Sequence, residues 1–541
     1  LFATQRSREI SPTSNYTPGR PGSPLTPDAG LVSTTRMIPQ RSNPLWLIFL
    51  VSALTTAGLR ADVRLHGLFS DHMVLQRNTA VPVWGWADDG EKIEVSFRKQ
   101  TVTTVAQQGK WMVKLSALDA GGPDDLRVRG RNEIVLHDVL VGEVWVASGQ
   151  SNMEWPMRLS YQPETEIAKT TQPQVRLYTV PKLKAQLPTN NVPSSWQPCL
   201  PANITNFSAV AYYFGRDLQQ ALKVPVGIIH SSWGGSPAEV WMSEQALSRN
   251  PRYKAEILDT YPVALKRYQD SLAAWEKERD AAKASGADFK KNKPNPPYWR
   301  PTELYNGMIA PLIPYAVQGA IWYQGESNAD RAEQYRSLFV DMIRNWRDDW
   351  KRKDLAFHLV QLAPFRDYKS EPAESTWAEL REAQWLATKT LRNVGMAVIT
   401  DVGEEKDIHP KKKEPVGSRL ALAARRITYG EKIVHAGPEY RSMRRKGSEI
   451  VLSFDNVGKG LVAQGGELKG FSIAGADRKF VWAQAKIHGN RVIVSSPQVA
   501  QPEAVRYGWA DFPVVNLWNA DGLPATPFRT DDFPMITAPK K

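Results

Sequence analysis

Cysteine is almost absent from this chain: Cys199 is the only one among 541 residues. A single thiol excludes an intramolecular disulfide, and it cannot supply the paired ligands of a zinc knuckle. The residues around it, from Trp196 to Pro201, are typical of a packed loop, which disfavours a catalytic thiol. The chemistry of the chain must therefore come from other residue types.

Long apolar runs are missing after residue 61, so we expect no membrane span. Nucleic-acid recognition motifs are missing as well, although the formal net charge is +13. The Lys and Arg residues are spread along the chain, and short runs such as Lys411–Lys413 and Arg444–Lys446 are typical of a solvated face. We expect no nucleic-acid partner. The sequence makes no prediction about the oligomeric state.

The first 61 residues differ from the rest in composition. Residues 1–36 are rich in Ser, Thr, Pro and Arg, as a disordered or untranslated extension would be. Residues 37–61 begin with Met37, carry Arg41 before an apolar core, and end in small residues, which is the pattern of a signal peptide cleaved near Ala61. No cysteine sits at this position, which excludes a lipoprotein. We expect a secreted or periplasmic protein.

Three further regions follow. Residues 62–140 alternate in polarity like the strands of a β-sandwich, with Ile93, Val95 and Phe97 on one face. Residues 141–430 contain short apolar strands separated by helical stretches, which indicates an α/β domain with a parallel sheet. The helical stretches are 209–222, 332–350 and 376–391. Residues 431–541 return to alternating strands such as 450–454 and 491–494, which predicts a second β-sandwich-like unit.

An insertion at about residues 252–300 interrupts the α/β domain. Six apolar side chains recur there at helical spacing, namely Ile257, Tyr261, Leu265, Tyr268, Leu272 and Trp275. The favoured interpretation is a helical hairpin packed on the domain. A lid over the functional site is the alternative.

Chemistry-bearing residues follow three of the apolar strands. Residues 141–148 lead to Gly149-Gln150-Ser151-Asn152, and residues 317–323 lead to Gln324-Gly325-Glu326-Ser327-Asn328. Residues 396–401 lead to a loop that contains Asp407-Ile408-His409-Pro410. Functional groups of open α/β sheets gather at the carboxyl ends of the strands, so we expect these three segments to meet.

These residue types fit acyl transfer by a serine nucleophile. Ser151 needs a base, and His409 is the best candidate, with Asp407 or Asp401 to orient its imidazole. The oxyanion of the tetrahedral intermediate needs donors, for which the Ser151 N–H, the Gln324 amide and the Gly234-Gly235 backbone are candidates. The Gly-x-Ser-x-Gly elbow of the α/β-hydrolases is absent around Ser151.

From about Asp62 to the C-terminus, the chain resembles the sialate O-acetylesterase-type carbohydrate esterases of the SGNH-hydrolase superfamily. The matching segments are 68–76, 142–145, 232–239, 304–309, 322–328, 407–410 and 522–529. The resemblance implies an SGNH-like parallel-sheet hydrolase domain with Ser151 as nucleophile, His409 as base, and Gly235 and Gln324 in the oxyanion hole. The chain departs from the usual Asp-x-x-His spacing, because residue 406 is Lys and the nearest acid is Asp407.

We therefore expect a secreted serine esterase that removes O-acetyl groups from carbohydrates through an acyl-enzyme, without metal or organic cofactor. Trp233 and Asn328 are expected to contact the sugar. For Trp233 the reason is that aromatic faces stack on sugar rings. Sialic acid and hemicellulose-type sugars such as xylose both remain open as substrates. The alternatives are an SGNH lipase or thioesterase, and a catalytically degenerate carbohydrate-binding protein.

Overall fold

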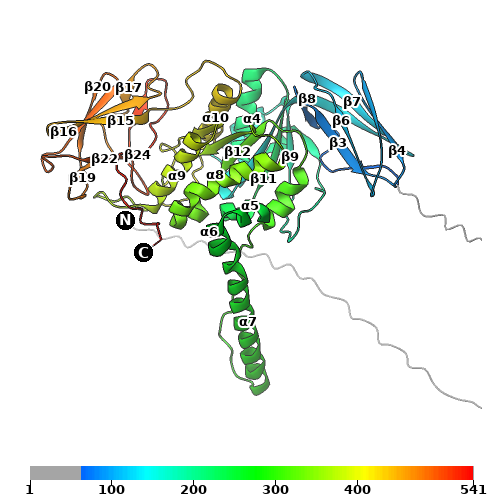
Figure 1. The fold of residues 1–541 in the computed structure, drawn as a ribbon, viewed down its shortest axis with the longest axis horizontal. Helices are drawn as coiled ribbons and strands as arrows, with labels where there is room; N and C mark the ends of the chain where they lie inside the picture. The colour runs from blue at the N-terminus through cyan, green and yellow to red at the C-terminus, as the bar shows by residue number, and fades with distance from the viewer. Residues whose placement is uncertain (1–61, 540–541) are drawn as a thin grey trace, which may run out of the picture. The chain divides into compact units, whose positions relative to one another are not determined.

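The computed structural model describes residues 62–539. The predicted extension (1–36) and signal peptide (37–61) lie outside these residues. Within them, the chain forms an α/β region with one large mixed sheet and additional β-sheet units (Figure 1). No helix of residues 62–539 is both long enough and apolar enough to cross a bilayer.

The N-terminal β unit consists of the three-stranded sheet β1-β3-β6 and of strands that belong to the large mixed sheet. Its strands are β1 (Arg64–Leu65), β2 (Val74–Gln76), β3 (Val81–Trp86), β4 (Lys92–Phe97), β5 (Gln100–Val105), β6 (Lys110–Leu115) and β7 (Gly121–Arg129). Buried and accessible positions alternate along β3, β4 and β6, and the predicted inward residues Ile93, Val95 and Phe97 are all buried. The alternation places one face of each strand in the core.

Strand β8 (Glu133–Gly149) joins this unit to the central sheet. Residues 133–141 pair antiparallel with β7, whereas residues 143–149 pair parallel with two strands of the central sheet. The boundary expected at residues 140/141 thus falls inside one continuous strand. The two regions also share one hydrophobic core.

The central sheet has the strand order β10-β9-β11-β8-β12-β13-β14 and is parallel except for β10. The remaining strands are β9 (Gln172–Thr179), β10 (Trp196–Cys199), β11 (Val226–Ser232), β12 (Gly319–Tyr323), β13 (Ala356–Val360) and β14 (Val394–Ala397). Strands β11, β12 and β13 are buried along their whole length, as expected for strands covered on both faces.

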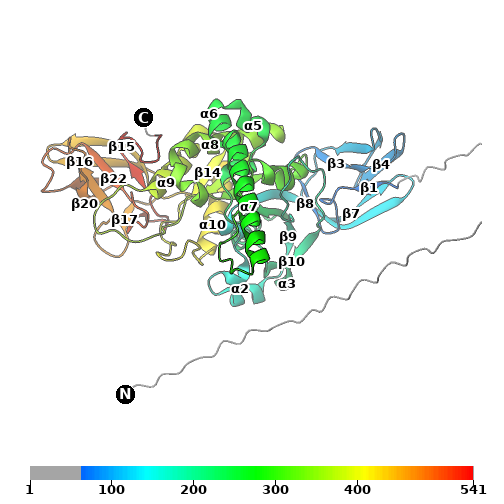
Figure 2. The same ribbon diagram turned by 90° about the horizontal axis from the view of Figure 1, so that it is seen from below.

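Two pairs of helices cover this sheet (Figures 1 and 2). They are α4 (Ala209–Leu222) with α10 (Glu414–Ala423), and α8 (Ala332–Asp349) with α9 (Thr376–Thr390). Trp145 of β8 packs on Phe214 of α4, whereas Trp322 of β12 packs on Phe339 and Trp346 of α8. Trp145 is in register with Gly319, and residues 319 and 322 point to opposite faces, so the helix pairs lie on opposite sides. The predicted helices at 209–222, 332–350 and 376–391 are confirmed to within one residue.

Shorter helical segments line the loops. They are α1 (Ser151–Glu154), α2 (Pro163–Lys169), α3 (Pro201–Ile204), α5 (Glu244–Arg249), α6 (Pro251–Tyr253), the π-turns at Lys254–Leu258, Tyr305–Ile309 and Ala424–Thr428, and the 3₁₀ turns at Met157–Leu159, Ala238–Trp241, Ala310–Leu312 and Glu326–Arg331.

The insertion contains one long helix, α7 (Thr260–Ser285), which extends away from α5 and α6 (Figure 1). None of its residues is buried. The chain returns along it without regular structure, and Trp275 Nε1 donates a hydrogen bond of 2.8 Å to Lys291 O. The favoured prediction of a helical hairpin packed on the domain is therefore wrong, because the apolar stripe of α7 meets only its own return segment.

The C-terminal β unit has its own hydrophobic core. Its strands are β15 (Glu439–Lys446), β16 (Glu449–Asp455), β17 (Leu461–Ala463), β18 (Phe471–Ala474), β19 (Val481–Trp482), β20 (Gln484–His488), β21 (Arg491–Ser495), β22 (Ala504–Tyr507), β23 (Leu517–Asn519) and β24 (Phe528–Arg529). They form the antiparallel sheets β15-β16-β21-β20 and β19-β18-β22-β24, and the ribbon β17-β23.

Candidate active site

Four loops that carry candidate residues leave the central sheet at the carboxyl ends of neighbouring strands. Ser151 follows β8, Gly234 and Gly235 follow β11, Gln324 follows β12, and His409 lies in the loop after β14. The ends of β8, β11 and β12 are level, because Gly149 is in register with both Ser232 and Tyr323. These loops therefore meet at one edge of the sheet.

The structure brings Ser151, His409 and Asp407 together. His409 Nε2 lies 2.8 Å from Ser151 Oγ, and its Nδ1 lies 3.5 Å from Asp407 Oδ1. The same Asp407 oxygen accepts a 2.9 Å hydrogen bond from the backbone N–H of His409. The indole of Trp155 is stacked on the imidazole, with ring centroids 4.9 Å apart. The imidazole is held on three sides, with Nε2 directed at the serine.

Asp401, the alternative acid, lies in a different contact. Its two carboxylate oxygens accept hydrogen bonds of 2.6 and 2.8 Å from Arg419. Of the two candidate acids, Asp407 contacts the histidine, whereas Asp401 is paired with Arg419.

Two glycines make room for the nucleophile. Gly149 has φ of +138°, and a Cβ there would lie 2.2 Å from Tyr323 O. Only glycine lets β8 and β12 approach this closely just before Ser151. A Cβ on Gly234 would lie 3.3 Å from Ser151 Cβ, so the loop after β11 passes directly beside the serine.

The backbone N–H groups of Ser151 and Gly235 lie near the serine hydroxyl. Neither has an acceptor among the described residues. The carbonyl of Gly235 accepts a 2.7 Å hydrogen bond from Trp299 Nε1, which fixes the orientation of this loop. The N–H of Gly234, by contrast, already donates to Glu154 Oε2 at 2.7 Å. Ser151 and Gly235 are therefore the donors available to an oxyanion.

Gln324 does not offer a free donor. Its Nε2 donates to Asn328 Oδ1 at 2.6 Å and to Ser236 O at 3.2 Å, while its Oε1 accepts from the Tyr335 hydroxyl at 2.9 Å. The side chain is fully buried. Against the expectation from the sequence, its amide holds the loops together and leaves no N–H for a substrate.

Asn328 differs from its expected role for the same reason. It is 1% exposed, its Oδ1 also accepts from the Ala238 N–H, and its Nδ2 donates to Glu239 Oε2 at 3.0 Å. A residue so enclosed cannot touch the sugar without rearrangement. Asn328 instead connects the loop after β12 to the loop after β11.

Trp233 is partly exposed and lies one residue from Gly234. The Nζ atoms of Lys182 and Lys184 lie 5.3 and 5.8 Å from its ring centroid, and Trp299 meets it edge-on. This surface is aromatic and basic, and it adjoins the nucleophile. Trp233 remains a candidate for contact with the sugar.

A buried polar cluster that the sequence did not reveal lies beside the serine. Asn152 Nδ2 donates to Glu326 Oε1 at 2.6 Å and to Ile408 O at 3.0 Å, and Asn152 Oδ1 accepts from Lys413 Nζ at 2.5 Å. Asn152 therefore joins the turn that carries Ser151 to the residue that precedes His409. Asn152 and Glu326 each lie in one of the three sequence motifs. For Lys413 the sequence was misleading: the run Lys411–Lys413 predicted a solvated face, but Lys413 is only 1% exposed.

Burial sets the protonation of these groups. It lowers the pKa of Lys413 to about 7 and raises the pKa of Glu326 above its usual value. The pKa of His409 is lowered, first by burial and then by the positive charge of Lys413, while Asp407 acts in the opposite direction. A lowered pKa keeps the imidazole neutral, which is the form that accepts a proton from serine.

Metal ligands are not gathered anywhere in residues 62–539, where no group of three or more His, Cys, Asp and Glu is placed to hold an ion.

Comparison with known proteins finds related sequences. The family model described as carbohydrate esterase, sialic acid-specific acetylesterase, matches residues 295–426. Sialate O-acetylesterases of Rattus norvegicus and Homo sapiens are each 27% identical, over 535 and 521 residues. These matches cover 89% and 86% of this chain, and 97% and 92% of the two relatives.

A solved structure is more similar. The crystal structure of a novel carbohydrate acetylesterase from Xanthomonas citri has 41% sequence identity with this chain and a TM-score of 0.76. The match covers 87% of this chain and 100% of that one.

Proposed function

The chain belongs to the carbohydrate esterases of the sialic acid-specific acetylesterase family and is a carboxylic ester hydrolase; from this premise we propose that it removes acetyl groups from carbohydrates by a serine acyl-enzyme route. The observation that carries the proposal is the 2.8 Å contact between Ser151 Oγ and His409 Nε2. An imidazole at this distance is within reach of the serine hydroxyl proton, which supports the proposal.

In the first half-reaction, Ser151 Oγ attacks the acetyl carbonyl carbon while His409 Nε2 takes the serine proton. The oxyanion accepts hydrogen bonds from the Ser151 and Gly235 N–H groups, for which residues 62–539 provide no acceptor. The tetrahedral intermediate then breaks its bond to the sugar oxygen. That oxygen takes the proton from His409, which leaves a neutral sugar hydroxyl and an acetyl-serine.

In the second half-reaction, His409 takes a proton from water as the water oxygen attacks the acetyl-serine. The proton returns to Ser151 Oγ when acetic acid leaves, and the acid then loses its remaining proton to the solvent as acetate. Asp407 holds Nδ1 of the imidazole and stabilises the imidazolium that forms in each half. Asn152 keeps the serine and histidine loops in register through its bond to Ile408 O.

Covalent labelling tests the proposal. A small phosphonate ester that reacts with activated serines should inactivate the enzyme stoichiometrically, and peptide mass spectrometry should place the adduct on Ser151. Ser327→Ala, which alters a serine in the loop after β12, serves as the matched control and should be labelled like the native enzyme. An adduct on another serine, or no inactivation, would remove the basis for the mechanism.

The choice of acyl group separates the esterase from a lipase or thioesterase. Gly234, which lies beside Ser151, donates its N–H to Glu154. Glu154 forms a 2.6 Å ion pair with Lys182, and the Lys182 ammonium lies over the ring of Trp233. A polar surround favours an acetyl group on a hydroxylated sugar over a long acyl chain. Rates on acetyl and octanoyl esters, followed by acetate release from a panel of acetylated sialosides and hemicellulose fragments, decide the acyl group and the sugar.

Export is a separate proposal that rests on the sequence of residues 37–61. If the signal is used, secreted protein should begin close to Asp62. N-terminal sequencing that finds residues 1–36 still attached would contradict it.

A further inference from the structure

The loop between β13 and α9, residues 361–375, leaves the central sheet at the same edge as the candidate active site. Strand β13 lies between β12, which leads to Gln324, and β14, which leads to the His409 loop. Most of the outer part of this loop is exposed, including Tyr368 at 52%. The loop therefore borders the candidate active site, but its outer part faces the C-terminal β unit.

The loop also contacts the histidine loop directly. The backbone N–H of Tyr368 donates a 3.0 Å hydrogen bond to Glu405 Oε1, and Asp367 forms an ion pair with Lys406. Glu405 and Lys406 come just before Asp407 in the chain. A ligand held by this loop would lie beside the segment that carries the proposed base.

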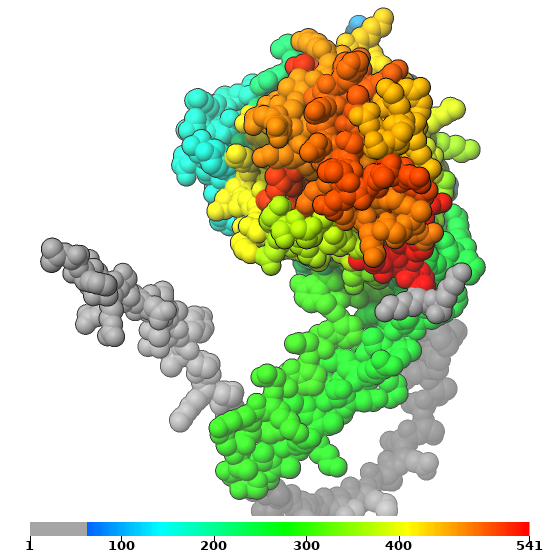
Figure 3. Space-filling model, turned by 90° about the vertical axis from the view of Figure 1, so that its left-hand side faces the viewer, coloured from blue at the N-terminus to red at the C-terminus, as the bar shows by residue number. Residues whose placement is uncertain are grey.

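A cavity of about 270 Å³ separates the outer part of this loop from the C-terminal β unit. In Figure 3, the yellow-green surface of the loop adjoins the orange surface of that unit. Small-molecule pockets start at roughly 300 Å³, so at about 270 Å³ the cavity lies at the small end of that range and suits about one sugar ring.

The walls of the cavity combine aromatic rings with polar groups. Tyr368 comes from the loop, and Trp482, Trp509 and Phe512 come from the C-terminal unit. The ring of Trp482 is 41% exposed although its Nε1 is already bonded to Ser370 O, so its face and not its polar atom is open. The polar lining includes Asp367, Lys369, Glu371, Glu374 and Lys469. Aromatic faces beside hydrogen-bonding groups match the apolar faces and hydroxyl edges of a sugar.

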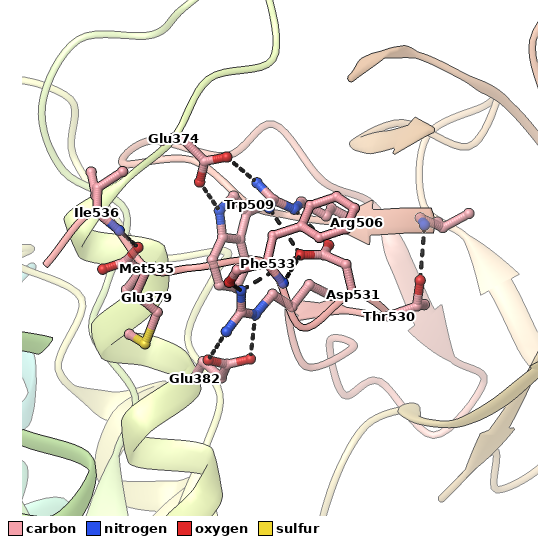
Figure 4. A network of polar contacts seen from close by, with 12 residues as sticks. Glu374, Glu379, Glu382, Arg506, Trp509, Thr530, Asp531, Phe533, Met535 and Ile536 are labelled. Carbon is pink, nitrogen blue, oxygen red and sulfur yellow. Dashed lines mark hydrogen bonds and ion pairs between the residues drawn. The ribbon is translucent and has the colours of Figure 1, made fainter. Parts of the chain in front are cut away.

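Two ion pairs connect the C-terminal unit to the loop and to α9 (Figure 4): Arg506–Glu374, in which Glu374 is 44% exposed, and Arg529–Glu382, which is largely buried. Arg506 binds Asp531 and also Glu374 of the loop, and its side chain is 4% exposed. Arg529 donates to both carboxylate oxygens of Glu382 in α9, at 2.8 and 3.1 Å. Breaking a buried pair by removing one partner is strongly destabilising, so the separation of the walls is fixed before any ligand arrives.

We propose that this cavity is a distal glycan subsite, which binds sugar units of the substrate beyond the acetylated one. The inference rests on the proposed function, since the glycan it binds is the one whose acetyl group is presented to Ser151. Contact at two places would favour acetylated oligosaccharides over acetylated monosaccharides.

The substitution Tyr368→Ala tests the subsite with little risk to the fold. Tyr368 is exposed, and its hydrogen bond to Glu405 uses the backbone N–H, which alanine retains. Tyr268→Ala in α7, a helix without buried residues, is the matched control. Trp482→Phe is a second variant, which removes the indole N–H and reduces the ring.

The substrates are an aryl acetate, an O-acetylated xylo-oligosaccharide, and an O-acetylated sialyl-oligosaccharide if the panel favours sialic acid. For Tyr368→Ala we expect the KM for the oligosaccharide to rise about three- to tenfold, with kcat and the aryl acetate rate unchanged, as loss of one stacking contact implies. An unchanged KM, or an equal fall in the aryl acetate rate, would overturn the subsite.

A binding experiment separates the two proposals. The deacetylated oligosaccharide should bind Ser151→Ala protein in calorimetry, and Tyr368→Ala should weaken that binding by a similar factor. No binding, or binding that Tyr368→Ala leaves unchanged, would overturn the subsite. Aryl acetate hydrolysis that survives Ser151→Ala would overturn the proposed mechanism while the binding result still decides the subsite.

Discussion

His409 lies between two opposite charges, and their balance controls the proposed base. Asp407 holds Nδ1 and raises the pKa of the imidazole, whereas burial and the positive charge of Lys413 lower it. Burial and Lys413 lower the pKa of the imidazole by more than Asp407 raises it. The pKa of the proposed base therefore lies below the ordinary value for histidine.

The first prediction concerns this balance. Since the base works in its neutral form, kcat/KM should fall to half its maximum at a pH below 6.5, the ordinary histidine pKa. Lys413 has a pKa of about 7 and is protonated over that range, so Lys413→Met should move the limb to higher pH. Lys412→Met, at the exposed neighbouring position, should leave it in place. A limb at or above 6.5 in the native enzyme would contradict the account.

The second prediction compares the two candidate acids. Asp407→Asn should reduce kcat by about 10² to 10⁴, because the imidazole loses the group that orients it and stabilises its charge. Asp401→Asn is the matched control, since Asp401 is paired with Arg419. The comparison needs only steady-state rates on an aryl acetate. A larger effect at Asp401 would show that the acid rearranges in solution.

At the scale of single residues, the sequence predicted the positions of the candidate functional side chains better than it predicted their hydrogen-bond partners. Two of the three motifs locate Ser151, His409 and Asp407, which the structure brings together, because each motif follows a recognisable buried strand. The free amides expected at Gln324 and Asn328 are instead bonded to one another. A sequence does not say which side chains satisfy a buried amide. Lys413 was predicted to lie on a solvated face because short runs of basic residues usually do. Nothing in the run distinguishes it from Lys411 and Lys412, which are exposed.

Among the elements, α7 departs most from what its pattern indicates. Its apolar spacing is that of a packed helix, yet its face is covered only by its own return segment, with Trp275 beside Phe289 and Lys291. Periodicity identifies a helix and an apolar face, but it does not identify the surface that covers that face.

The third prediction follows from the exposure of α7. Because Trp275 and Lys291 are in contact, residues 276–290 can be replaced by a short Gly-Ser linker without separating the two legs. Acetyl ester turnover and the thermal midpoint should stay close to the native values, since no buried residue of α7 is removed. A large loss of turnover with an unchanged thermal midpoint would instead favour a lid.

Strand β8 shows why element boundaries were harder to predict than element types. The sequence marks residues 141–148 as a buried strand, whereas the observed strand is Glu133–Gly149. Its first half alternates less regularly and pairs with β7, so it reads as part of the preceding unit. Because β8 pairs first with β7 and then with the central sheet, its first half is partly exposed and its second half is continuously buried.

For the whole molecule, three buried histidines link stability to pH. Burial lowers the pKa of His66 and of His230 to about 4, and that of His358 to about 3. In the unfolded chain these groups titrate near 6.5, so between pH 6.5 and about 4 the unfolded state binds more protons. Stability must therefore decrease as the pH falls through this window, by up to about 1.4 kcal/mol per pH unit for each group.

The fourth prediction states this as a measurement. The thermal midpoint of unfolding should fall between pH 7 and pH 5. His358→Gln should reduce that dependence, because its amide can still reach Thr428 Oγ1 but does not titrate. A midpoint that rises on acidification, or an unchanged slope in the variant, would show that other groups control the acid response.

The architecture as a whole was largely predictable. Alternating strands, buried strands and helices each have their own period, and the α/β region with additional β units follows from their order. The cavity between the C-terminal unit and the loop after β13 was not predictable, because its walls come from segments about a hundred residues apart in sequence.

The central claim is that Ser151 is the nucleophile, and the fifth prediction tests it through the rate of acetate release from an acetyl ester by Ser151→Ala. The substitution removes one oxygen from a turn whose backbone it leaves intact, so the thermal midpoint should be preserved. The account predicts that kcat/KM falls by about 10⁴ or more, with only the residual catalysis of the oxyanion donors and binding. A folded Ser151→Ala enzyme that keeps its rate within tenfold of the native value would contradict it.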